Sequence, residues 1–113
     1  CNASSTVAPW QGKRGKLGTN PICFGVPGGS PFLLDMATTT VAANKIFNAH
    51  SAGKAEIPAG WALDREGVPT TSTEAAYQGL LQPLGGYKGS GLAVMVEMLC
   101  GVLSGGAVSD ELG

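Results

Sequence analysis

The sequence from Leu81 to Gly106 reads LQPLGGYKGSGLAVMVEMLCGVLSGG, a glycine-rich loop with one lysine that runs directly into an apolar helix. Glycine lets a backbone approach a ligand closely, and the first N–H groups of a helix favour negative charge. The ammonium of Lys88 adds to that preference. The stretch is therefore a candidate anion site that a nucleotide phosphate would fit. Its glycines are Gly85, Gly86, Gly89 and Gly91.

The spacing of these glycines matches neither standard phosphate-binding motif. A Walker P-loop has GxxxxGK followed by Ser or Thr, whereas Lys88 precedes Gly89 and Ser90 here. A dinucleotide fingerprint has GxGxxG, and Gly86, Gly89 and Gly91 occur in the reverse order. On residue chemistry alone, a phosphate site and a turn that only packs the helix closely against a strand carry equal weight.

The rest of the pattern predicts an α/β protein. Thr38, Thr39 and Thr40 are expected to cap a helix that stops at Gly53. Apolar strands between helices favour helices that cover a mixed sheet. The expected elements are a loop over 1–20, strands over 21–26 and 32–35, a helix over 38–52, an irregular connection over 53–71, one or two helical turns over 72–79 and a buried helix over 89–104.

Four segments of the chain form a familiar set: GTNPICFGVPGG (18–29), FLLDMATTT (32–40), IPAGWALDREGVPTT (57–71) and LGGYKGSGLAVMVEMLCGVLSGG (84–106). Together they resemble the second, non-Rossmann malate/L-lactate dehydrogenase family, which includes ureidoglycolate, sulfolactate, diketogulonate and piperideine-carboxylate oxidoreductases. This resemblance implies a three-layer α/β/α fold with a mixed sheet, a non-standard dinucleotide-binding domain that is incomplete in this chain. Residues 1–113 would then be part of one NAD(P)-binding domain, with the other domain and both ends of the parent chain absent.

The resemblance also implies a set of cofactor contacts. The family's DMA-type segment and the lysine of its GYKG-type loop lie against the nicotinamide cofactor, and the loop over Asn2–Ser5 resembles a further cofactor-lining loop. On chemistry alone, Asp35 is equally a partner for ribose hydroxyls and a cap of the helix that follows. The implied cofactor residues are Asp35, Met36, Ala37, Tyr87 and Lys88, with Ser4 ranked second.

The expected function is hydride transfer between NAD or NADP and a 2-hydroxy or 2-keto acid such as malate or lactate. Two alternatives stay open: a non-catalytic nucleotide- or phosphate-binding module that keeps the Lys88 loop, and a structural remnant without a ligand. By resemblance the parent protein is a homodimer. We expect the 113-residue chain alone to be inactive, and to be poorly folded because its apolar helix over 89–104 loses covering surface.

His50 is the only histidine, but its position late in a predicted helix favours a surface or capping role over catalysis. In the resembled family the catalytic histidine precedes everything present here, so no catalytic residue is assigned. No metal is expected either, because the carboxylates of Asp64, Glu66, Asp110 and Glu111 have no neighbouring His or Cys.

Composition excludes several other classes of protein. The net charge is −1 and charged residues make up 13%, so no nucleic-acid-binding face is indicated, and Lys13-Arg14-Gly15-Lys16 reads as a solvated turn. Three cysteines without CxxC spacing, two of them in apolar runs where a buried thiol is usual, favour a reduced, cytoplasmic setting. The apolar run over 92–103 is interrupted by Glu97 and is too short to span a membrane.

Overall fold

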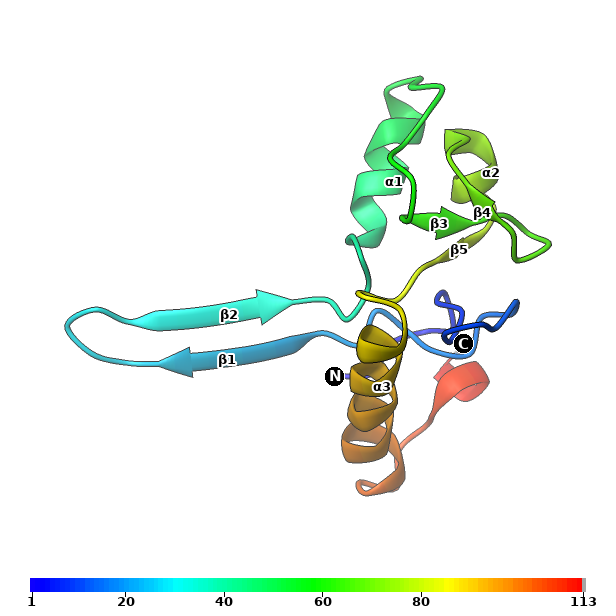
Figure 1. The fold of residues 1–113 in the computed structure, drawn as a ribbon. Helices are drawn as coiled ribbons and strands as arrows, with labels where there is room; N and C mark the ends of the chain where they lie inside the picture. The colour runs from blue at the N-terminus through cyan, green and yellow to red at the C-terminus, as the bar shows by residue number, and fades with distance from the viewer. Residues whose placement is uncertain (113) are drawn as a thin grey trace.

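The structure is a computed structural model that describes residues 1–112. It contains helices and two small sheets, with a β-hairpin that extends away from the remainder of the chain (Figure 1). The elements are β1 (Ile22–Val26), β2 (Phe32–Met36), α1 (Ala43–Ser51), β3 (Ala62–Leu63), β4 (Pro69–Thr70), α2 (Thr73–Tyr77), β5 (Leu80–Leu81), α3 (Tyr87–Glu97), the π-helix η1 (Met98–Val102) and the 3-10 helix η2 (Ser109–Leu112).

The hairpin of β1 and β2 confirms both strands expected from the sequence. The strands are antiparallel, and Phe24 lies opposite Leu34. Because side chains alternate along a strand, the register gives the hairpin one strongly apolar face and one mixed face. The apolar face carries Ile22, Phe24, Val26, Phe32, Leu34 and Met36, and the other face carries Cys23, Gly25, Leu33 and Asp35. Cys23 is exposed, so the expectation of a buried thiol is wrong there.

The second sheet has the strand order β4-β3-β5, with antiparallel pairs. It occupies part of the stretch 53–71 that was expected to be irregular. The chain turns at Asp64, whose carboxylate accepts hydrogen bonds from the N–H groups of Glu66 (3.0 Å) and Val68 (2.9 Å). Gly67, with a φ of 78°, completes the turn. This geometry joins β3 to β4.

Helix α1 begins at Ala43, five residues later than expected, so the prediction that the threonines cap it is wrong. Their hydroxyls are used elsewhere: Thr38 donates to the Thr19 carbonyl (3.0 Å) and Thr39 to the Val41 carbonyl (2.7 Å). The predicted end at Gly53 is confirmed by its φ of 67° and its N–H bond to the His50 carbonyl (2.9 Å). The predicted turns after residue 72 are confirmed as α2, capped by the Ser72 hydroxyl.

Helix α3 begins at Tyr87, and η1 continues it to Val102. The helix was expected to be buried all round, but only one side of it is. Gly89, Ala93, Val96 and Glu97 are buried, whereas the later apolar residues are largely exposed, up to 75% for Leu103. The exposed apolar side agrees with the expectation of a partly uncovered helix.

The core lies among the N-terminal segment, α1, α2, β3 and β5. Val7 pairs with Leu17 in an antiparallel bridge and with Leu81 in a parallel bridge, which attaches the N-terminal segment to β5. The buried apolar cluster comprises Val7, Leu17, Ile46, Ala49, Ile57, Ala62, Ala76, Leu81 and Ala93. The α/β class is therefore confirmed. The three-layer arrangement stays a prediction.

Candidate functional site

The segment after β2 meets the loop before α3. The Thr38 carbonyl accepts a hydrogen bond from the Leu84 N–H (3.0 Å), and the Thr40 N–H donates to the Gln82 carbonyl (3.0 Å). These bonds bring the Asp35–Ala37 segment to the side of the loop that carries Tyr87 and Lys88. Five of the six predicted cofactor residues therefore come from two segments that adjoin in the structure.

Gly89 is needed for this junction to form. A Cβ atom on Gly89 would lie 2.5 Å from the carbonyl oxygens of both Leu84 and Thr38, and it would also collide with the Leu84 nitrogen. The Gly89 N–H is already bonded to the Leu84 carbonyl (2.7 Å). At Gly89 the packing interpretation of the loop therefore holds, and its N–H is not free to bind an anion.

The first turn of α3 nevertheless presents binding groups. The Gly86 N–H donates to the Pro83 carbonyl and the Ser90 N–H to the Gly86 carbonyl, both at 3.1 Å. Within residues 1–112 this leaves the N–H groups of Tyr87 and Lys88 for a ligand. Both side chains are exposed, with Tyr87 at 61%.

Trp10 contacts Tyr87, a pairing that no pattern in the sequence indicates. The two rings meet edge to face with centroids 5.7 Å apart. The Trp10 N–H of the main chain donates to the Ser90 hydroxyl (3.1 Å), which fixes the tryptophan beside the start of α3. A Cβ on Gly86 would lie 3.2 Å from the indole, so the small residue and its φ of 64° accommodate the ring.

Asp35 and Met36 lie on opposite faces of the hairpin. Asp35 is exposed and pairs with Cys23, whereas Met36 is half-buried and pairs with Ile22. The capping interpretation of Asp35 is wrong, because α1 begins at Ala43 and its N-cap position is Ala42. Its interpretation as a ligand contact stays a prediction.

Ser4 lies beside the middle of α3 and not at its first turn. The neighbouring Ala3 N–H donates to the Asn20 side-chain oxygen (3.0 Å), and the Asn20 amide donates to the Ala93 carbonyl (2.9 Å). Along the helix axis, Ala93 is about 9 Å from Tyr87. The Ser4 side chain is exposed, so the predicted contacts fall into two groups separated along one helix.

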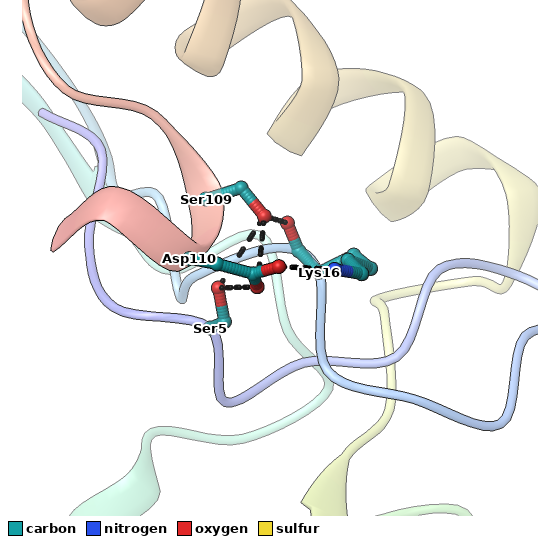
Figure 2. Close-up of polar contacts among 4 residues, drawn as sticks. All are labelled: Ser5, Lys16, Ser109 and Asp110. Atoms are coloured by element: carbon teal, nitrogen blue, oxygen red, sulfur yellow. Dashed lines mark hydrogen bonds and ion pairs between the residues drawn. The ribbon is translucent and has the colours of Figure 1, made fainter. Parts of the chain in front are cut away.

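Residues 2–5, here called the Ser4 segment, are also held by a polar cluster that the sequence did not indicate (Figure 2). Lys16 forms an ion pair with Asp110, and Ser5 donates to the same carboxylate (3.2 Å). Ser109 donates to the Lys16 carbonyl (2.9 Å). The bond from Lys16 holds the pKa of Asp110 below its ordinary value, with smaller contributions in the same direction from Ser5 and Ser109.

The half-buried His50 side chain, on α1, contacts two residues of α2. Its Nε2 lies 2.8 Å from a Glu74 oxygen, and its ring stacks on Tyr77 with centroids 4.0 Å apart. Across residues 1–112, no group of three or more His, Cys, Asp or Glu side chains is placed to hold a metal ion. Nor is any helix in those residues both long enough and apolar enough to cross a membrane.

The surface has hollows on two sides of the core. One of about 280 Å³ borders the α3 loop between the Pro9–Lys13 turn and Gly86. A wider one of about 710 Å³ lies between α1 and Trp61, and none of the six predicted cofactor residues lines it. None of the six lines the first hollow either, and only Tyr87 directly follows a residue of its lining, Gly86.

The chain is similar in sequence to known proteins. The chain is 43% identical over 99% of its length to a Delta(1)-pyrroline-2-carboxylate reductase from Agrobacterium fabrum. It is 49% identical over 92% of its length to a (2R)-3-sulfolactate dehydrogenase (NADP(+)) from Chromohalobacter salexigens. It covers 33% and 32% of those proteins.

Among solved structures, the chain resembles the delta1-piperideine-2-carboxylate reductase of Pseudomonas syringae with a TM-score of 0.88 and 41% identity, covering 95% of this chain and 33% of that one. The chain thus spans about a third of the length of the proteins it matches. The family model described as malate/L-lactate dehydrogenase matches residues 1–113. The chain therefore belongs to the malate/L-lactate dehydrogenase family.

Proposed function

We propose that the protein transfers a hydride between a nicotinamide cofactor, NAD or NADP, and a 2-hydroxy or 2-keto acid, and that residues 1–113 are part of one NAD(P)-binding domain. The observation that carries this proposal is the junction of the Asp35–Ala37 segment with the Tyr87–Lys88 loop, held by the Leu84–Thr38 hydrogen bond. Family membership and the names of the relatives support it.

The groups at this junction fit a dinucleotide. The Lys88 ammonium and the two N–H groups at the start of α3 favour phosphate, and the exposed Asp35 carboxylate can accept hydrogen bonds from ribose hydroxyls. Tyr87, held against Trp10, positions the loop. Since Asp35 and Met36 point to opposite faces of the hairpin, we propose that Met36 and Ala37 contribute mainly through the main chain.

The bound nicotinamide supplies hydride acceptance and donation. The residues of this chain bind and orient the cofactor, and we propose that the proton-transferring group lies outside residues 1–113, because His50 is held by Glu74 and Tyr77. The relatives are named for substrates that share one feature, a carboxylate whose neighbouring carbon bears an oxygen or an imine nitrogen. We propose the same substrate class for this protein. Malate and lactate are candidates within that class.

We further infer that the parent protein is a cytoplasmic homodimer, which light scattering and fractionation would test. A non-catalytic phosphate-binding module has less support, because the relatives described above are all named as dehydrogenases or reductases. A remnant without a ligand would leave the exposed Lys88 without a role.

The test is titration of the protein with NADH and NADPH, with Lys88→Ala as the variant. Loss of a charge-assisted hydrogen bond predicts binding weaker by about 1–3 kcal/mol with the fold intact. Lys54→Ala is the matched control, since it removes an exposed positive charge away from the loop. Unchanged affinity of the Lys88 variant for both nucleotides would contradict the phosphate role. Turnover assays with pyruvate, oxaloacetate, glyoxylate and a cyclic 2-imino acid would then define the substrate.

A further inference from the structure

We propose that Glu97 is a positioning residue of the cofactor site, which acts with Asn20 and η2 to hold residues 2–5 so that Ser4 faces the cofactor. This inference rests on the proposed function, because it assigns Ser4 to the nicotinamide cofactor. It concerns a buried carboxylate that the hydride-transfer scheme does not otherwise use.

Glu97 is 7% exposed on a helix whose other buried residues are apolar or glycine. Its Oε1 accepts a hydrogen bond from the Asn20 amide (3.1 Å), and its Oε2 accepts one from the Asn2 amide (3.1 Å). Both donors are neutral. A buried carboxylate without a cation is costly, and an apolar residue would pack there at lower cost. The carboxylate is better explained by what it connects than by stability.

Asn20 links this carboxylate to the main chain of the Ser4 segment. It is 0% exposed, and all its side-chain bonds are satisfied within the fold. Its oxygen accepts from the Ala3 N–H, while its amide donates to Glu97 and to the Ala93 carbonyl. Glu97 therefore orients the Asn20 amide, and Asn20 in turn fixes Ala3.

The opposite side of the segment is held by residues that follow α3 in the sequence. The Asn2 amide donates to the Ala107 carbonyl (2.9 Å), and the Ser5 hydroxyl lies 3.4 Å from the Ser109 hydroxyl and donates to Asp110 (Figure 2). Asn2, Ala3 and Ser5 are thus each held by a distant residue. Ser4 is left exposed between two fixed neighbours.

The backbone at both anchors is strained. Asn20 has a φ of 33° and Ser109 a φ of 50°, which places both in the left-handed region although neither is glycine. Such strain persists where the surrounding contacts over-determine a conformation, and it clusters at ligand sites. A segment fixed before binding loses less conformational freedom when the ligand arrives, and this favours affinity.

The first experiment measures amide hydrogen exchange of residues 2–5 without nucleotide, in wild type, Glu97→Gln and Val96→Ala. Glu97→Gln keeps the side-chain shape, but the new NH₂ group would face the NH₂ group of either Asn2 or Asn20. We expect the Ala3 amide to exchange roughly three to ten times faster in this variant, from the loss of about one hydrogen bond. Val96, equally buried on the same helix, controls for general loss of stability, and its variant should leave exchange in 2–5 unchanged. Unchanged exchange of the Ala3 amide in Glu97→Gln would contradict the proposed role of Glu97 in holding residues 2–5, whether or not nucleotide binds.

The second experiment is a double-mutant cycle on nucleotide affinity with Glu97→Gln and Ser4→Ala. If Glu97 acts through Ser4, each single variant weakens binding roughly three- to tenfold and the double variant is no weaker than either. Additive losses of affinity would contradict the proposal that Glu97 acts through Ser4. A purely structural role of Glu97 would lower the melting temperature without changing the affinity. If wild type binds neither NADH nor NADPH, the proposed function fails, and so does the proposed role of Glu97 in cofactor binding. If Ser4→Ala alone has no effect while Lys88→Ala weakens binding, only the present inference fails.

Discussion

Gly89→Ala tests whether close packing at the start of α3 builds the candidate site. The added Cβ would lie 2.5 Å from the carbonyl oxygens of Leu84 and Thr38, and every atom it meets belongs to the main chain. A side chain could rotate out of the way, but these backbone atoms can move only if the loop or the segment after β2 shifts. The substitution therefore forces apart the two segments that carry Asp35–Ala37 and Lys88.

The expected cost follows from that geometry. Overpacking in a well-packed region typically costs about 1–3 kcal/mol, and three collisions with main-chain atoms place Gly89→Ala toward the upper end. Replacing glycine by alanine inside a helix returns only about 0.5–1 kcal/mol. We expect a net loss of roughly 1–2 kcal/mol in the free energy of unfolding, together with weaker nucleotide binding, because the junction is displaced.

Gly91→Ala supplies the matched control. Gly91 lies two residues further along α3, and a Cβ there meets no atom within 4 Å. This variant is expected to gain about 0.5–1 kcal/mol from helix propensity and to bind nucleotide as wild type does. Urea unfolding and titration with NADH and NADPH measure both quantities. Equal stability changes in the two variants would refute the packing explanation of Gly89.

Three further predictions concern Asp35, Asp110 and His50. Asp35→Asn should weaken nucleotide binding with little change in melting temperature, because the side chain is exposed and caps no helix; a lower melting temperature with unchanged affinity would reverse that assignment. Since the pKa of Asp110 is lowered from 3.8, chiefly by Lys16, its pairing stabilises the fold above that value and is lost as the pH falls through the lower folded pKa. Stability curves of wild type and Asp110→Asn should therefore converge below pH 3.8, and a constant offset would contradict the pairing. In the parent protein proposed above, His50→Ala should leave kcat within about twofold, whereas a loss of about 100-fold or more would make His50 the acid/base.

Local sequence signals predicted the parts of the fold that local chemistry controls. The apolar runs on either side of the Pro27–Pro31 turn became β1 and β2, and Gly53 ended α1 as expected. The threonines before α1 were assigned wrongly as caps, because Thr38 and Thr39 bond to carbonyls outside the helix. Strands β3, β4 and β5 have two residues each, too short for an alternating pattern to identify them.

From the sequence, the candidate site was assigned only where the chain contains a family motif. Asp35–Ala37 and Tyr87–Lys88 were assigned by resemblance, and the structure brings those two segments together. Glu97 was noted only as a charge that interrupts an apolar run, because its partner Asn20 is 77 positions away in the sequence. Trp10 was likewise missed, since its contacts with the start of α3 form only in the folded chain.

Helix α3 organises all of the proposed contacts. Its first turn carries Lys88, its Gly89 packs against the segment after β2, and its last turn carries the Glu97 carboxylate that bonds to Asn20 and Asn2. A variant that displaces the helix should therefore weaken every contact together, whereas Asp35→Asn or Ser4→Ala should remove one contact and leave the others. Comparing the affinity lost in Gly89→Ala with the sum of those single losses would show whether one helix sets the whole site. A loss in Gly89→Ala no larger than that of one contact residue would indicate that the segments are positioned independently of α3.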